Sequence, residues 1–106
     1  MSKRIVLTPK ASADIDRHVK YLLARNEEAA LRLFDAIRLT MAQVAQMPNA
    51  GQLYRSKHSR LNGLRKRAVR GFKNYLVFYF ARDRTVEVIR ILYATQDISS
   101  ILESDI

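Results

Sequence analysis

Residues 65–93 read RKRAVRGFKNYLVFYFARDRTVEVIRILY, a stretch that begins with cations and continues as two apolar runs. The runs, residues 75–80 and 86–93, are rich in β-branched and aromatic side chains, which suit a pleated, half-buried surface. Only a short polar link, residues 81–85, separates them. A parallel return needs a dozen residues or more, so these two strands must pair antiparallel. The basic residues 65–69 form a further strand that leads into this hairpin.

Periodic apolar residues upstream predict two helices. A short strand over residues 3–7 ends at Thr8, a good N-cap, and Pro9 suits the first helical position. One amphipathic helix runs from there to about residue 25, and a second begins after Asn26 and stops at residues 47–51. The expected apolar stripes comprise Ala11, Ile15, Val19, Leu22 and Leu23, then Ala30, Leu33, Phe34, Ile37, Met41, Val44 and Ala45. The residues expected to face away from the first stripe are Lys10, Asp14, Arg17 and Lys20.

The order of these elements predicts an α+β fold. The short connection makes the two helices an antiparallel hairpin. Residues 52–63 are polar and basic and form the least regular segment, while residues 95–102 predict a last short helix, capped at Thr95 or Asp97. Its buried side should consist of Ile98, Ile101 and Leu102. We expect β-αα-βββ-α, with the helical hairpin on one face of a small, mainly antiparallel sheet, in one domain over residues 1–106.

Composition excludes several kinds of chemistry. The 106 residues include no cysteine, so disulfides and thiolate chemistry are absent, as suits a reducing compartment. His18 and His58 are too far apart in sequence, and too isolated, to form a metal-ligand set, and the glycines are too scattered to form a phosphate loop. His18 adjoins an apolar stripe and is best explained as a structural residue. The apolar run near the N-terminus is too short for a signal peptide, so we expect a cytoplasmic protein without membrane contact or cofactor.

Positive charge is concentrated in the second half of the chain. The net charge is +9, and residues 54–73 hold eight Lys and Arg residues without one acid. Such a block attracts phosphates or an acidic protein segment, although a solvated loop is the simpler alternative. Five tyrosines and the cations could supply parts of an RNA-cleaving site, but only if a pKa fell by several units. Tyr75 and Tyr79 share one face of a strand, and packing within the sheet is the better explanation for both.

Four segments in the same order resemble the ParE branch of the RelE/ParE toxins. Residues 5–15 (IVLTPKASADI) are similar to its opening strand and Thr-Pro, and residues 47–51 (MPNAG) to its Pro-x-x-Gly. Leu64-Arg65 with residues 75–79 (YLVFY) resembles the central strands, and residues 88–97 (VIRILYATQD) the closing strand and turn. The resemblance implies the toxin of a type II toxin–antitoxin pair of the plasmid-stabilisation kind, which arrests growth.

The same resemblance separates two activities. The RelE branch consists of ribosome-dependent messenger RNA endonucleases, and the ParE branch consists of DNA gyrase poisons. Where the endonucleases place two arginines and a tyrosine, this chain has Tyr75, Gln96 and Leu102. The resemblance therefore implies a protein without catalytic residues that binds gyrase and traps its DNA-cleaved state. The alternatives are a RelE-type endoribonuclease, a toxin-like fold with another binding role, and a DNA-binding module.

Two partners follow from this interpretation. DNA gyrase, alone or with its bound DNA, should meet the basic block, for which the candidate contacts are Arg65, Lys66, Arg67, Arg70, Lys73 and, for stacking, Tyr75. Glutamate at Arg65, Lys66, Arg67 and Arg70 should abolish toxicity and leave the fold intact. The resemblance also implies an acidic ParD-like antitoxin, whose amphipathic segment would fill a groove or extend the sheet. Its contact residues cannot be assigned from the sequence.

Overall fold

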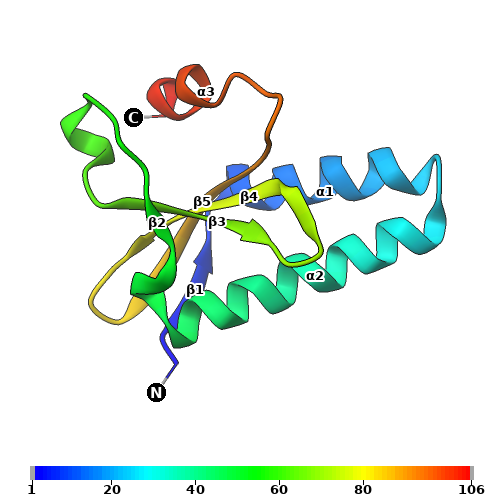
Figure 1. The fold of residues 1–106 in the computed structure, drawn as a ribbon, viewed down its shortest axis with the longest axis horizontal. Coiled ribbons are helices and arrows are strands. Elements are labelled where there is room, and N and C mark those ends of the chain that lie inside the picture. The colour runs from blue at the N-terminus through cyan, green and yellow to red at the C-terminus, as the bar shows by residue number, and fades with distance from the viewer. Residues whose placement is uncertain (1, 106) are drawn as a thin grey trace.

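The computed structural model describes residues 2–105, and its element order confirms the α+β expectation. The elements are β1 (Arg4–Leu7), α1 (Pro9–Leu23), α2 (Glu27–Gln46), the 3₁₀ turn η1 (Pro48–Ala50), β2 (Gln52–Leu53), the 3₁₀ turn η2 (Ser59–Leu61), β3 (Leu64–Val69), β4 (Phe72–Ala81), β5 (Thr85–Tyr93) and α3 (Ile98–Ser104). The strands form one sheet in the order β1-β5-β4-β3-β2 (Figure 1). β1 runs parallel to β5, and every other neighbouring pair is antiparallel.

Local chemistry sets the ends of the helices. The Thr8 hydroxyl accepts from the Ala11 amide at 3.1 Å, and the Asn26 side chain accepts from the Ala29 amide at 3.1 Å, so both expected N-caps are confirmed. At α3 the cap is Asp97, whose carboxylate accepts from the Ser100 amide. No helix among residues 2–105 is long and apolar enough to cross a membrane.

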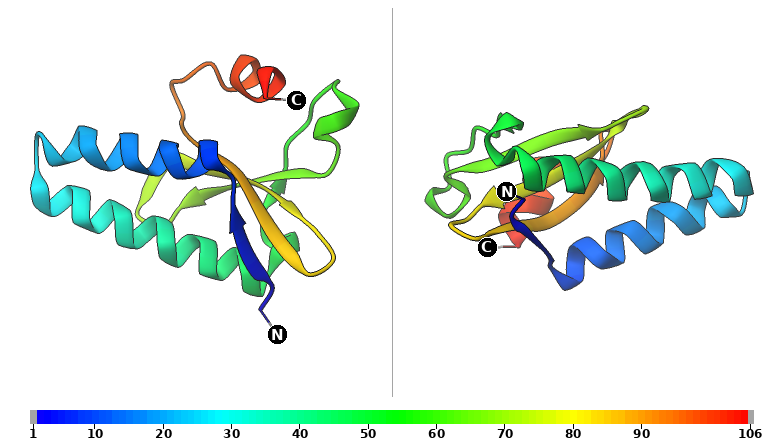
Figure 2. Two further views of the ribbon diagram at one scale, coloured as in Figure 1. Left: turned by 180° about the vertical axis from the view of Figure 1, so that it is seen from behind. Right: turned by 90° about the horizontal axis from the view of Figure 1, so that it is seen from below.

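The sheet is packed on both faces (Figures 1 and 2). The side chains of Tyr75, Val77 and Tyr79 face α1 and α2, whereas Phe78 and Phe80 face α3 and the η2 segment. Tyr75 and Tyr79 therefore share one face as predicted. The helical hairpin is longer than the sheet is wide, and its free end projects beyond the strands (Figure 2).

The expected apolar stripes need correction at two positions. Leu33 is fully buried, but Phe34 is 46% exposed, because the buried face of α2 runs through Ala30, Leu33 and Ile37. Phe34 lies one residue, about 100°, further around the helix. Leu23 is 49% exposed because it ends α1 at the projecting tip. The segment expected to be least regular contains the edge strand β2, which is only two residues long and has no apolar pattern of its own.

Asp14 was expected to face away from the apolar stripe but is fully buried. β1 stops pairing with β5 at Leu7, and side chains of α1 then take over the hydrogen bonds of the exposed β5 edge. The Ile91 amide donates to the Asp14 carboxylate at 2.9 Å, and His18 Nε2 donates to the Ile91 carbonyl at 2.8 Å. His18 is therefore the structural residue that the sequence predicted, and Asp14 is a second one.

Candidate binding surfaces

The predicted cationic block is divided by the pleat of β3. Arg65 and Arg67 pair opposite Tyr79 and Val77, so their side chains lie on the helix side of the sheet. Lys66 pairs opposite Phe78 and lies on the α3 side. The candidate residues from this strand are close in space but do not form one continuous patch.

Arg65 is engaged in holding the backbone. Its guanidinium donates to the carbonyls of Asn49 at 3.1 Å and Gly51 at 2.7 Å. The buried Tyr79 hydroxyl accepts from the Gly51 amide at 3.0 Å and donates to the Pro48 carbonyl at 2.8 Å. Arg65 and Tyr79 together fix the turn between α2 and β2. Glutamate at Arg65 should therefore disturb this turn as well as remove a cation, because a carboxylate cannot donate to these carbonyls.

The other four cations are available for a partner. Arg70 and Lys73 flank the tight β3–β4 turn, where Gly71 has a φ of 81°, and both are exposed. Lys66 and Arg67 are partly exposed. None of the four forms an ion pair with another residue of the described chain, 2–105.

Tyr75 is only 8% exposed, unlike the four cations. Its ring packs edge-on against Tyr93, with centroids 4.8 Å apart, and against His18 at 5.1 Å. It cannot act as a stacking platform on the outer surface beside the basic block. It does line a separate hollow, described below.

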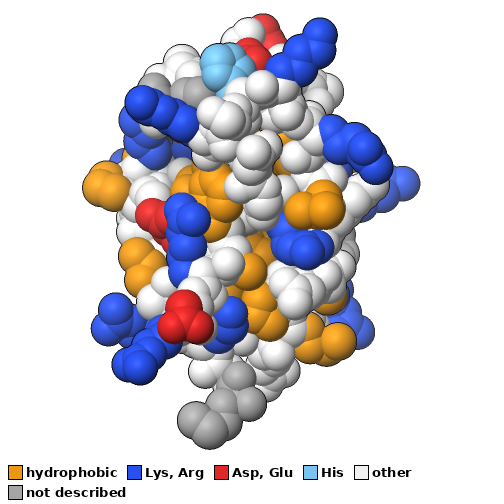
Figure 3. Space-filling model, turned by 90° about the vertical axis from the view of Figure 1, so that its left-hand side faces the viewer, with side chains coloured by type: hydrophobic (Ala, Val, Ile, Leu, Met, Phe, Trp, Pro, Cys, Tyr) orange, Lys and Arg blue, Asp and Glu red, His pale blue; other side chains and the backbone are white. Residues whose placement is uncertain are grey.

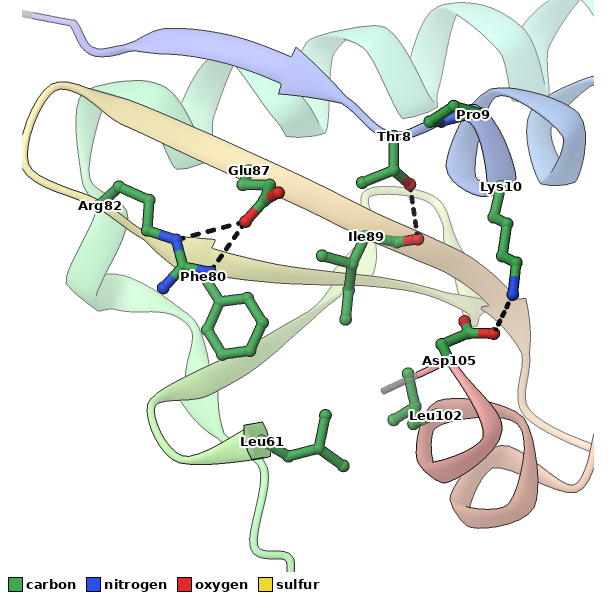
Figure 4. A pocket seen from close by; sticks show the side chains of 10 residues that line it. All are labelled: Thr8, Pro9, Lys10, Leu61, Phe80, Arg82, Glu87, Ile89, Leu102 and Asp105. Atoms are coloured by element: carbon green, nitrogen blue, oxygen red, sulfur yellow. Dashed lines mark hydrogen bonds and ion pairs between the residues drawn. The ribbon is translucent and has the colours of Figure 1, made fainter. Parts of the chain in front are cut away.

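A groove opens on the α3 side of the sheet, with a volume of about 470 Å³ (Figure 4). It is lined by Thr8, Pro9, Lys10, Leu61, Phe80, Arg82, Glu87, Ile89, Leu102 and Asp105. Aliphatic and aromatic side chains from β4, β5, η2 and α3 form its floor (Figure 4). Figure 3 looks onto the side that carries η2 and the β4–β5 turn, where Lys and Arg side chains surround scattered hydrophobic ones.

Two ion pairs border the groove. Arg82 donates to Glu87 at 2.9 Å while its guanidinium lies 4.3 Å above the Phe80 ring. On the other side Lys10 donates to Asp105 at 2.6 Å. The groove therefore combines an apolar floor with charged walls, which suits an amphipathic peptide segment.

A deeper ionic cluster ties α1, β5 and α3 together. Arg90 donates to Asp14 through two nitrogens, at 2.7 and 2.8 Å, and to Asp105 at 2.9 Å. Arg17 adds a third bond to Asp14 at 2.7 Å. Burial alone would raise the pKa of Asp14, but the bonds from Arg90, Ile91 and Arg17 outweigh it and hold the pKa below its ordinary value. This cluster serves stability and was missed because its partners are far apart in sequence.

The buried hydroxyls of Tyr75 and Tyr79 are poorly suited to act as a general base. Burial raises the pKa of the Tyr75 and Tyr79 hydroxyls, which moves both away from general-base chemistry near neutral pH. Within residues 2–105, no three side chains of His, Cys, Asp or Glu gather where they could hold a metal ion.

Comparison with known proteins identifies the family of this chain. The model of the family described as "ParE toxin of type II toxin-antitoxin system, parDE" matches residues 5–98. No protein with a curated description matches the chain. Among solved structures, a chromosomal ParDE system from P. aeruginosa superposes with a TM-score of 0.71 at 19% identity, covering 87% of this chain and 96% of that one.

A YoeB/ParE toxin from Agrobacterium tumefaciens superposes with a TM-score of 0.56 at 16% identity, over 85% of this chain and 96% of that one. At such low identity these two structures show a shared fold. The family model extends over most of the chain, from β1 to the start of α3. The chain belongs to the ParE toxin family of type II toxin–antitoxin systems.

Proposed function

We propose that this ParE-type toxin arrests growth by binding DNA gyrase in the cytoplasm and holding it in its DNA-cleaved state. The observation that carries the proposal is the set of unpaired cations around β3 and the β3–β4 turn: Lys66, Arg67, Arg70 and Lys73. A protein bound to cleaved DNA offers a strongly anionic surface, which such a set would recognise. The raised pKa values of the buried tyrosines favour inhibition by binding over cleavage of RNA.

The second partner in the proposal is an acidic, ParD-like antitoxin. Its amphipathic segment would lie in the groove of Figure 4, with apolar side chains on the Phe80, Ile89 and Leu102 floor. Ordering such a segment costs a few kcal/mol, so the apolar floor has to supply the tight part of the binding. The net charge of +9 would speed the encounter with an acidic chain.

Gyrase assays with a charge-reversed variant test the first partner. The variant carries glutamate at Lys66, Arg67, Arg70 and Lys73 and keeps Arg65, which the turn requires. The matched control carries glutamate at four exposed cations elsewhere, Arg4, Arg32, Arg38 and Arg84, and so has the same net charge. We expect wild type and control to inhibit supercoiling and to accumulate cleaved DNA, and the first variant to do neither.

Two results would contradict the proposal. One is equal inhibition by both variants, which would show that the cations around β3 are not the contact. The other is cleavage of ribosome-bound messenger RNA by the purified wild-type protein with gyrase turnover unchanged. That second result would assign the chain to the endonuclease mechanism instead.

A further inference from the structure

A second hollow, of about 410 Å³, lies between α1 and the adjoining ends of β4 and β5. It is lined by His18, Tyr21, Leu22, Tyr75, Tyr93, Thr95 and Gln96. Four of these side chains are aromatic, and none is acidic. The Tyr75 ring packs edge-on against both His18 and Tyr93. The proposed function assigns no contact to any residue of this hollow.

The hollow presents neutral hydrogen-bonding groups of both kinds. Burial lowers the pKa of His18, so its ring is neutral near pH 7, and Nε2 must carry the proton because it faces the Ile91 carbonyl. His18 Nδ1 is then an acceptor, and it has no hydrogen-bond partner among residues 2–105. Every side-chain nitrogen or oxygen that is fully enclosed in this part of the chain does have a partner, so Nδ1 must be open to solvent. Gln96 Oε1 accepts from the Tyr93 amide at 2.7 Å, which leaves its amide hydrogens as donors.

Cations stand beside these neutral walls. The Arg25 guanidinium lies 3.8 Å above the centre of the Tyr21 ring, so it reaches the rim of the hollow. Arg17 is close enough to His18 for its charge to lower the pKa of the imidazole, and its side chain is 53% exposed. Asp14, whose charge also acts on His18, is ion-paired with Arg90 and Arg17.

We propose that this hollow binds an unpaired nucleobase of a single-stranded nucleic acid. A base is planar and aromatic and carries both donors and acceptors on its edge, as the tyrosine walls, His18 Nδ1 and the Gln96 amide require. A flanking phosphate meets Arg25, whose guanidinium lies over the Tyr21 ring. A peptide side chain of an acidic partner would satisfy the cations but would leave the acceptor and donor unused. The site goes beyond the proposed function, which needs no contact with a base.

Direct binding of oligonucleotides tests the site without gyrase or antitoxin. Fluorescence anisotropy compares a labelled DNA strand of about twelve nucleotides, its RNA counterpart, and an abasic DNA strand of equal length. We expect wild type to bind a base-bearing strand about tenfold more tightly than the abasic one, since stacking of one base supplies roughly this factor. The DNA and RNA arms show which nucleic acid the hollow prefers.

Two variants localise the effect. Tyr21 is 58% exposed, so Tyr21→Ala removes one wall of the hollow with little risk to the fold, and it should bring the ratio of the two affinities close to one. Phe34→Ala removes an aromatic ring that is also exposed but lies outside the hollow, and it should leave the ratio unchanged. Glutamate at the four cations around β3 should weaken both strands alike and preserve the ratio.

Equal binding of the base-bearing and abasic strands by the wild-type protein overturns the proposal, as does the absence of binding to either. If Tyr21→Ala weakens capture of an acidic antitoxin and leaves the strand ratio unchanged, the hollow serves a protein partner and the proposal is wrong. Neither result bears on gyrase inhibition, which is measured separately.

Discussion

Replacing Asp14 by alanine should destabilise the protein by about 4 kcal/mol, although sequence periodicity places this residue on a solvent-facing side of α1. Its carboxylate is fully buried and accepts four hydrogen bonds, two from Arg90, one from Arg17 and one from the Ile91 amide. The substitution leaves a nearly buried guanidinium and a buried amide without their acceptor. Either loss alone exceeds the effect of an ordinary surface mutation.

The magnitude follows from the three partners. Breaking a buried ion pair from one side costs about 3–5 kcal/mol, and Arg90 keeps Asp105 at 2.9 Å, which holds this cost near the lower end. The orphaned Ile91 amide adds about 1 kcal/mol or more. Arg17 contributes little, because its side chain is 53% exposed and solvent screens the pair. A domain of this size has only about 5–15 kcal/mol of stability, so the melting temperature should fall by tens of degrees.

Urea unfolding of a double-mutant cycle measures the pair directly. Arg90→Met removes the buried cation and keeps an apolar side chain in its place. We expect the double variant, Asp14→Ala with Arg90→Met, to be more stable than the sum of the single effects by about 2 kcal/mol or more. Arg17→Ala is the matched control, which should cost about 0.5 kcal/mol or less. Additive single effects, or a cost below about 1 kcal/mol for Asp14→Ala, would refute the reasoning.

Acid unfolding independently checks that the ionised Asp14 carboxylate stabilises the fold. The pKa of Asp14 is lower in the folded than in the unfolded chain, so its stabilisation is complete above about pH 4. It is lost as the pH falls through the depressed folded value. The wild-type protein should therefore lose stability below about pH 4 more steeply than Asp14→Ala does. Burial would also raise the pKa of Asp105, but hydrogen bonds from Lys10 and Arg90 outweigh it and lower that pKa. Both carboxylates therefore stabilise the fold less as the pH falls.

Four further expectations concern other parts of the structure. A Cβ at Gly51 would lie 2.1 Å from the Tyr79 hydroxyl, so Gly51→Ala should cost roughly 2 kcal/mol in urea unfolding. Tyr79→Phe leaves the buried Gly51 amide and the partly buried Pro48 carbonyl without their partner, and it should cost about 1–3 kcal/mol. Leu33→Ala should cost about 2–5 kcal/mol while Phe34→Ala stays near zero; the reverse order would contradict the corrected stripe of α2. Burial lowers the pKa of His18 below 6.5, so the unfolded chain binds the proton at a higher pH than the folded chain does. The free energy of unfolding should therefore fall as the pH drops below about 6.5. His18→Gln should show a smaller decrease, measured as the urea midpoint between about pH 7 and 5.

Much of the fold follows from signals that act over a few residues. Thr8 and Asn26 cap their helices because a side-chain oxygen can reach an amide three residues ahead, which requires no knowledge of the tertiary structure. Gly71 takes a φ of 81° in the two-residue turn between β3 and β4. Glycine adopts this conformation readily because it has no Cβ. The alternation of residues 75–80 places every second side chain on the helix side. Each of these features is decided locally, and the predicted caps and the shared face of Tyr75 and Tyr79 are confirmed.

Asp14 and Arg65 show where local reasoning fails. Both are charged residues that the fold uses internally, and the atoms that they contact come from distant segments: Arg90 lies 76 positions from Asp14, and Asn49 lies 16 from Arg65. The sequence around Arg90 does contain an indication, because Arg90 is the one charged residue within the apolar run 88–93. A buried arginine in such a strand needs an acceptor for its guanidinium. That signal identifies the need for a carboxylate but not which of the chain's acids supplies it. Arg65 carried none, because it stands among other cations.

The distribution of burial over the sheet limits where function can lie. Phe78 and Tyr79 are adjacent in β4, point to opposite faces, and are both fully buried, so neither face at the centre of the sheet can receive a ligand. What remains open is the periphery: the cations at β3 and its turn, the groove beside α3, and the hollow under α1. No residue lines more than one of these surfaces, so the side chains of one can be substituted while those of the other two are kept. A gyrase contact, an antitoxin and a nucleobase could therefore occupy one small domain at separate places, and variants confined to one surface can distinguish them.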